Sequence, residues 1–165
     1  MKSFPNRLKL ANLPTRIEKL HRFSQQLGID VYVKRDDMTG TEWSGNKIRK
    51  LEFSVHEALD LGADTLITCG GLQSNHCRAT AAVAARLDLH SCLLLRTEDN
   101  APPLDGNYLL DRLLGAKIRF ISQEDYRTRR GEVLQELAEE AARAGHKAYI
   151  IPEGASNGIG TFGYL

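Results

Sequence analysis

The sequence has few cysteines and no long apolar run, and each shortage excludes a class of protein. Its three cysteines are an odd number without a CxxC pair, which argues against a disulfide framework or a zinc site. Reduced thiols favour a cytoplasmic protein. No apolar stretch approaches the roughly 20 residues that span a bilayer, and the N-terminus lacks the apolar core of a secretory signal. We therefore expect no membrane contact.

A surplus of charge of either sign is also missing. The chain has 165 residues, of which 22 are basic and 21 are acidic, and no basic stripe suggests a nucleic acid partner. The motifs GxGxxG, GxxxxGK[ST] and GxSxG are absent, as is any cluster with metal-ligand spacing. A generic nucleotide-binding domain therefore stays a distant alternative, and we expect no metal.

Strand-like and helix-like segments alternate in most of the chain. Apolar, β-rich runs predict strands at 64–69, 91–95, 117–121 and 147–151, and amphipathic or alanine-rich runs predict helices at 74–87, 106–114 and 124–144. Strands that alternate with helices build parallel sheets. The pattern predicts an α/β fold with an open parallel sheet and helices on both faces.

The two ends of the chain follow a less regular pattern. Thr15 is expected to cap a helix that ends near Gly28. A strand at 29–34, a loop at 36–40 and a helix at 46–61 follow. Residues 161–165 resemble the first turn of another helix, so we expect a truncated chain.

The stretch Ser44-Gly45-Asn46-Lys47 places a lysine at the start of a predicted helix, behind a flexible turn. A lysine amine is a nucleophile for carbonyl chemistry, and glycine lets a ligand approach the backbone closely. Most lysines are simply solvated, which is the ordinary alternative. Lys50, one turn further along the same helix, and more weakly Lys34 are rival candidates.

A second glycine-rich turn, Gly70-Gly71, precedes Ser74, Asn75 and His76 at another predicted helix start. The first-turn N–H groups of a helix attract anions, and the hydroxyl and amide suit a substrate carboxylate and a ring oxygen. An ordinary capping arrangement explains the same residues. His76 is a candidate acid or base, although a histidine at a helix start more often packs or caps.

Four motifs in this order resemble the aminocyclopropane-carboxylate deaminase/D-cysteine desulfhydrase family. They are Lys34-Arg35-Asp36-Asp37, SGNKIRKLEF at 44–53, CGGLQSNHCR at 69–78 and IIPEGASNGIGTFGY at 150–164. These enzymes are similar to the tryptophan synthase β subunit, have fold type II and use pyridoxal phosphate (PLP). The basic Arg78 looks closer to the desulfhydrase branch.

The resemblance implies a role for each matching residue. Lys47 would form the Schiff base with PLP and act in catalysis, with Asn46 beside it at the cofactor. Ser74 would be the catalytic serine near the substrate carboxylate, and Asn75 would contact the cofactor ring. Ser74, Asn75 and His76 together would bind the carboxylate of a small amino acid.

The resemblance also implies a division of the chain. Residues 1–50 would be the N-terminal part of a larger PLP domain, residues 51–153 the small open α/β domain, and residues 154–165 a return into the larger one. The loop that binds the PLP phosphate is expected in a second half that these residues do not contain. A homodimer is expected for the full-length protein.

The expected reaction is an α,β-elimination that converts D-cysteine to pyruvate, sulfide and ammonia. Two alternatives remain open. One is ring opening of aminocyclopropane-carboxylate or elimination from another amino acid such as cysteate. The other is a non-catalytic fragment that lacks the phosphate-binding loop.

Overall fold

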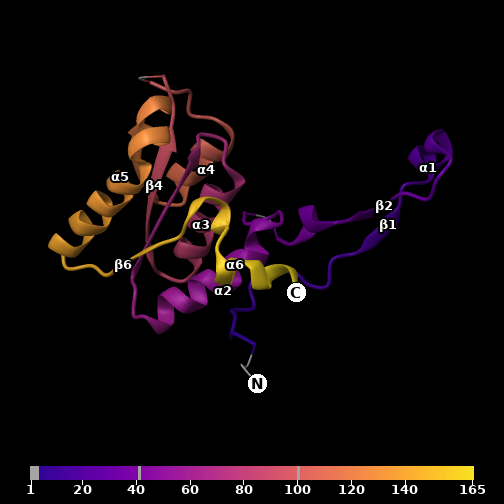
Figure 1. Cartoon of the computed structure of the whole chain (residues 1–165), viewed down its shortest axis with the longest axis horizontal. Helices are drawn as coiled ribbons and strands as arrows, with labels where there is room; N and C mark the ends of the chain where they lie inside the picture. The colour runs from indigo at the N-terminus through magenta and orange to yellow at the C-terminus, as the bar shows by residue number, and fades with distance from the viewer. Residues whose placement is uncertain (1–3, 41, 100) are drawn as a thin grey trace.

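A four-stranded parallel sheet forms the centre of the molecule (Figure 1). The computed structural model describes residues 4–40, 42–99 and 101–165. The strands are β3 (Thr65–Gly71), β4 (His90–Arg96), β5 (Lys117–Ile121) and β6 (Ala148–Ile150), in the order β5-β4-β3-β6. The strands predicted for this sheet are confirmed to within two residues at each end.

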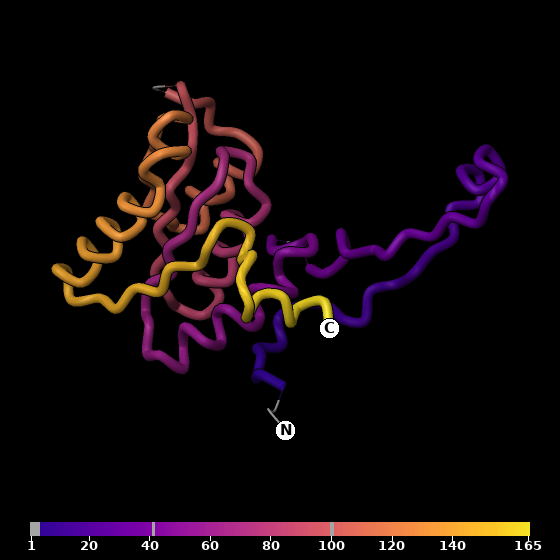
Figure 2. The backbone as a smooth tube through the Cα atoms, in the orientation of Figure 1, coloured from indigo at the N-terminus to yellow at the C-terminus, as the bar shows by residue number. Residues whose placement is uncertain are grey.

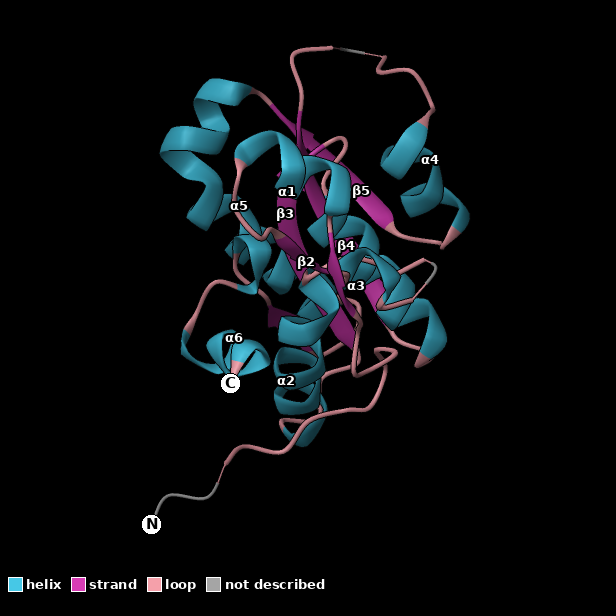
Figure 3. Cartoon of the chain, turned by 90° about the vertical axis from the view of Figure 1, so that its right-hand side faces the viewer, coloured by secondary structure: helices cyan, strands magenta, loops and turns pink. Residues whose placement is uncertain are grey.

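Helices cover both faces of the sheet, as the alternation predicted (Figure 3). Leu93 and Leu95 of β4 pack against α3 (Asn75–Arg86) and α4 (Gly106–Leu113). Cys92 and Leu94, which point to the opposite face, pack against α5 (Gln123–Arg143). This period-two alternation within one strand is what a sheet buried on both faces requires.

The helix α2 (Lys47–Asp60) packs beside α3 through a fully buried set of apolar side chains that includes Ile48, Leu51 and Val55. They recur at helical spacing, so one stripe of α2 faces the core. The predicted helix at 46–61 is therefore confirmed, with its first residue at Lys47.

The end of the chain returns to the head of α2, as Figure 2 shows. It consists of short turns, η2 (Glu153–Ala155), α6 (Gly158–Thr161) and η3 (Phe162–Tyr164). Gly163 lies so close to α2 that an added Cβ would be 2.6 Å from the carbonyl of Arg49. The predicted helix start at 161–165 is corrected: the α-helical turn comes earlier, and residues 162–164 form a 3-10 turn.

The prediction for the N-terminal region was partly wrong. Residues Ile17–Lys19 form a strand, β1, which pairs antiparallel with β2 (Tyr32–Lys34). The helix between them, α1 (His21–Leu27), starts later than predicted, and Gly28 caps its C-terminal end, close to where the sequence predicted. Pairing with the second strand outweighs local helix propensity here, and Thr15 donates its hydroxyl to Asp36 Oδ1 at 2.9 Å instead of capping the helix.

This hairpin, β1-α1-β2, projects as an arm from the rest of the molecule (Figure 1). Its base is fixed by η1 (Asp36–Met38), where Arg49 of α2 forms an ion pair with Asp36 at 2.7 Å. The domain boundaries proposed at residues 50 and 153 stay a prediction.

Candidate active site

The turn before α2 gives Lys47 its place at the head of the helix. Gly45 has φ of +106°, a conformation that favours glycine. The fully buried Thr39 holds this turn, because its Oγ1 accepts from the N–H of Gly45 at 3.0 Å. Asn46 donates from Nδ2 to the hydroxyl of Tyr164 at 2.6 Å, so the last turn of the chain also anchors it.

The three candidate lysines have different partners. Lys47 donates from Nζ to Oδ1 of the adjacent Asn46 at 3.1 Å. Lys50 donates to the carbonyl of Gly154 at 3.2 Å and to Oγ of Ser156 at 3.0 Å, while Lys34 donates to the carbonyl of Thr15. Lys50 and Lys34 therefore each bind a distant segment of backbone, and Lys47 does not.

The turn after β6 lies against the side chain of Lys47. A Cβ added to Gly154 would be 3.7 Å from Cε of Lys47, and its φ of +67° also favours glycine. Burial, followed by the charge of Lys47, lowers the pKa of Lys50. The two ammonium groups are therefore close enough to repel each other, at one point where α2 meets the returning chain.

Ser74 and Asn75 lie at the N-terminus of α3, where β3 ends. Ser74 is the N-cap: its Oγ accepts from the N–H of Cys77 at 3.2 Å. Gly70 makes this position of Ser74 possible, since a Cβ at residue 70 would be 2.6 Å from Oγ of Ser74. The exposed Asn75 accepts on Oδ1 from Nδ2 of Asn107 at 3.0 Å, which leaves its own Nδ2 free to donate to a ligand.

His76 occupies a different environment from its two neighbours. Only 3% of it is exposed, and its Nε2 lies 2.8 Å from Oγ1 of Thr68 in β3. Burial, with the charges of Lys47 and Lys50, lowers the pKa of His76 to about 4, against a weaker opposing hydrogen bond to the backbone of Pro152. The imidazole is thus a neutral interior group at neutral pH, and only its backbone N–H is left for the predicted carboxylate contact.

Sequence reasoning missed the side chains that connect these parts. Arg78 of α3 donates to the carbonyl of Ser44 at 2.7 Å and to Oδ1 of Asn107 in α4 at 2.9 Å. Asn107 in turn donates to the carbonyl of Gln73 at 2.8 Å. The signal available was the position of residue 107 in the first turn of the helix that follows β4. The starts of such helices gather at the same edge of the sheet as Ser74.

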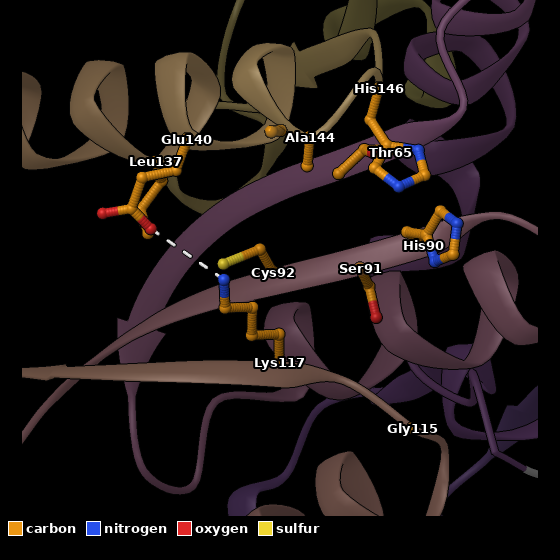
Figure 4. Close-up of a pocket in the computed structure, with 11 residues that line it drawn as sticks. Thr65, His90, Ser91, Cys92, Gly115, Lys117, Leu137, Glu140, Ala144 and His146 are labelled. Atoms are coloured by element: carbon orange, nitrogen blue, oxygen red, sulfur yellow. Dashed lines mark ion pairs between the residues drawn. The ribbon is translucent and has the colours of Figure 1, made fainter.

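A separate cavity of about 280 Å³ lies at the opposite end of the sheet (Figure 4). Its walls come from the first residues of β4 and β5 and from the last turns of α5, and they include His90, Cys92 and Lys117. Lys117 lies 3.9 Å from Glu140 across this space. None of the predicted site residues lines it, because they gather where β3 ends and not where the strands begin.

Residues 4–40, 42–99 and 101–165 show no metal cluster, no disulfide and no membrane-spanning helix. This part of the chain contains no group of three or more His, Cys, Asp or Glu side chains that could hold a metal ion. The three cysteines are buried free thiols. No described helix combines the length and the apolar character needed to cross a membrane.

Comparison with known proteins identifies the family. Residues 8–164 match a family described as "Pyridoxal-phosphate dependent enzyme". The chain belongs to this family. The resemblance in the sequence motifs is therefore confirmed, and PLP is the cofactor on which the family depends.

Individual PLP-dependent relatives agree with this assignment. The chain is 49% identical over 161 residues to a bifunctional D-cysteine desulfhydrase/1-aminocyclopropane-1-carboxylate deaminase of Arabidopsis thaliana, covering 94% of the chain and 40% of that protein. It is 45% identical to a D-cysteine desulfhydrase of Klebsiella pneumoniae, covering 98% and 49%. The solved structure of an ACC deaminase homologue matches with a TM-score of 0.88 and 42% identity, over 97% of this chain and 48% of that one.

The chain spans about half the length of the curated relatives that it matches. It shares the α/β fold of the ACC deaminase homologue, including the parallel sheet flanked by helices. The residues at the head of α2 and α3 fit part of a PLP site. Among the residues that the structure describes, they provide an amine without a distant partner, a glycine at its side, and a helix N-terminus with an amide donor that has no partner.

Proposed function

We propose that the protein containing this chain is a PLP-dependent lyase that eliminates sulfide from D-cysteine. The observation that supports this most is the placement of Lys47. Its ammonium has no partner beyond the adjacent Asn46 among the described residues, and its charge reaches His76 on α3, next to Ser74. Such an elimination needs an amine that holds the cofactor and a group that binds the substrate carboxylate. Lys47 and the N-terminus of α3 are the candidates for these two roles.

Each residue has a proposed role. Lys47 would hold the cofactor and would remove the proton from the substrate α-carbon at Nζ. Ser74 and the first-turn N–H groups of α3 would fix the substrate carboxylate, and the free Nδ2 of Asn75 would donate to the cofactor ring oxygen. Asn46, held by Tyr164, would orient Lys47. When bound, PLP supplies the electron sink for the negative charge that develops at the α-carbon.

The balance of the reaction is simple. The α C–H bond and the β C–S bond of D-cysteine break, and sulfur leaves as hydrogen sulfide. Addition of one water then releases ammonia and leaves pyruvate. Ring opening of aminocyclopropane-carboxylate is the second candidate, because a relative is named for both activities. The α-carbon of aminocyclopropane-carboxylate bears no hydrogen, so the α-proton removal proposed for Lys47 applies to D-cysteine alone, and holding the cofactor is the only role that Lys47 would have in both reactions. The substrate is a small amino acid in either case, and the homodimer and the cytoplasmic location stay predictions.

The test uses the complete protein and its substitution Lys47→Ala. We expect the visible absorption of lysine-linked PLP to disappear and turnover to fall by at least about 10²-fold, since a positioned acid–base group contributes about 10²–10⁴-fold. Lys50→Ala should keep the absorption band, because Lys50 binds the 154–156 turn. The exposed Lys9→Ala is the matched surface control.

Product analysis of the same protein separates the two candidate reactions. Sulfide and pyruvate from D-cysteine support the first proposal, whereas 2-oxobutyrate from aminocyclopropane-carboxylate without sulfide release supports the second. A folded Lys47→Ala variant that retains both the band and turnover would refute the role of Lys47 in either reaction.

A further inference from the structure

Three buried polar atoms without a partner belong to one residue of α3 and one residue of α4, two helices that pack against each other. In the described part of the chain they are both carboxylate oxygens of Asp111 and Nε of Arg78. The residue Asp111 is completely buried. An isolated buried charge is costly, so such a group in a folded protein calls for an explanation. Burial raises the pKa of Asp111, and the positive charge of Arg78 opposes this rise without forming an ion pair or a hydrogen bond with Asp111 among the described residues.

The two terminal nitrogens of Arg78 contact groups next to the candidate active site. One nitrogen donates to the carbonyl of Ser44 at 2.7 Å, and the other donates to Oδ1 of Asn107 at 2.9 Å. Ser44 lies three residues before Lys47, in the turn that contains Gly45. Arg78 is itself half-buried on α3, four residues after Ser74.

Asn107 carries the connection to the remaining site residues. Its Nδ2 donates to Oδ1 of Asn75 at 3.0 Å and to the carbonyl of Gln73 at 2.8 Å. Its backbone N–H donates to Oε1 of Gln73 at 2.7 Å. A continuous chain of hydrogen bonds therefore joins the turn before Lys47, through Arg78 and Asn107, to the start of α3.

We propose that Arg78 is a positioning residue that fixes the turn before Lys47 relative to Ser74 and Asn75. The proposal rests on the function proposed above, because it concerns the same two groups. Arginine is well suited to this position, since its planar fork presents two donors to two acceptors, the carbonyl of Ser44 and Oδ1 of Asn107. Lysine would keep the charge but has one nitrogen and cannot reproduce the fork.

The expected loss of rate depends on how far Lys47 moves when Arg78 no longer holds the turn before it. A shift of about 1 Å between a catalytic group and its substrate can cost about 10²-fold in rate. The carboxylate contacts at Ser74 and the α3 N-terminus do not involve Arg78 directly. Loss of the fork should therefore reduce kcat much more than it raises KM.

The first experiment compares Arg78→Lys with wild type in the complete protein, with Arg112→Lys as the control, since Arg112 is exposed on α4 next to Asp111. We expect kcat to fall ~10- to 100-fold, KM to stay within about threefold, and the absorption of lysine-linked PLP to shift or broaden. The control should match wild type in all three readouts.

The second experiment measures hydrogen exchange in the cofactor-free protein, so that it does not depend on activity. Arg78→Lys should raise exchange in residues 42–47 and leave the arm at 17–34 unchanged. If Arg78→Lys fails to fold, Asn107→Ala breaks the same chain of hydrogen bonds from α4 and should produce the same local increase.

The outcomes separate this inference from the proposed function. Unchanged exchange and unchanged kcat in Arg78→Lys overturn the positioning role, even if Lys47→Ala confirms the function. A uniform rise in exchange over the whole protein also overturns it, because that marks a general structural role. A local rise at 42–47 in a protein without turnover supports the positioning role and counts against the function.

Discussion

Two ammonium groups one helical turn apart have different surroundings at the head of α2. Lys50 is fixed to the 154–156 turn by two hydrogen bonds, and burial lowers its pKa. Lys47 keeps its amine near Gly154, where no Cβ fills the space beside Cε. At the residue scale, the two lysines therefore differ in their contacts, and the role of Lys47, which the motif resemblance implies, stays a prediction.

Asp111 makes stability depend on pH in a direction opposite to most carboxylates. Burial raises the pKa of Asp111 to about 7, against the pull of Arg78, from an ordinary value near 3.8. The folded state therefore binds this proton more tightly than the unfolded state does. Its contribution to stability is full below about pH 4 and is lost as pH rises to about 7.

We predict that Asp111→Asn, which mimics the protonated acid, raises the free energy of unfolding at pH 8 by about 1–3 kcal/mol and leaves it unchanged near pH 4. Urea unfolding at both pH values measures this. Asp88→Asn on the surface is the matched control and should shift stability equally at both. If the free energy of unfolding changed with pH by the same amount in wild type and in Asp111→Asn, the raised pKa of Asp111 would be contradicted.

Wild type and Asp111→Asn must be compared at each pH, because His76 changes the stability with pH in the direction opposite to Asp111. The pKa of His76 is lowered in the fold, to about 4 from 6.5, so its contribution is full above about pH 6.5 and is lost as pH falls toward 4. The difference between wild type and Asp111→Asn removes this shared effect.

At the element scale, the N-terminus of α3 can lie close to β3 only because residue 70 is a glycine without a Cβ atom. A Cβ on Gly70 would lie 2.6 Å from Oγ of Ser74 and 2.9 Å from Sγ of Cys77. The helix start therefore lies against the strand backbone, and any bulk at position 70 must move Ser74. This close approach ties the fold directly to the candidate carboxylate site.

We predict that Gly70→Ala destabilises the protein by about 1–3 kcal/mol through overpacking and raises KM for the amino acid as Ser74 moves. Gly131→Ala is a control with the opposite sign. Gly131 is exposed within α5 and has open space around it, so alanine should stabilise the helix by about 0.5–1 kcal/mol. Unfolding curves and substrate titrations of both variants measure these effects; an unchanged KM in Gly70→Ala would separate the site from this contact.

At the scale of the whole molecule, the proposed function gives the chain an amine and a carboxylate site, while the motif resemblance implies that the loop that binds the PLP phosphate lies outside these residues. We predict that residues 1–165 alone bind PLP far more weakly than the complete protein does. Titration of each with PLP, followed by the absorption of the lysine adduct, measures the difference. Equal affinity would show that these residues already hold the phosphate.

The sheet and its helices were predictable because their signals are local. The apolar runs at 64–69 and 91–95, the glycines that follow α1, α2, α4 and α5, and the alanine-rich run of α3 each indicate their own element. The arm was not predictable in the same way. Ile17–Lys19 became a strand because Tyr32–Lys34 lies beside it, and the central pair of that register, Glu18 and Val33, is separated by a whole helix in the chain.

By itself, the sequence determined the α/β alternation, the position of Lys47 at a helix start and the capping role of Ser74, because these depend on neighbours within a few residues. Only the tertiary structure decided that Lys50 binds Gly154, that His76 turns inward and that Arg78 joins Ser44 to Asn107. Those contacts depend on side chains brought together from segments far apart in the chain, and their formation follows from packing rather than from local preference.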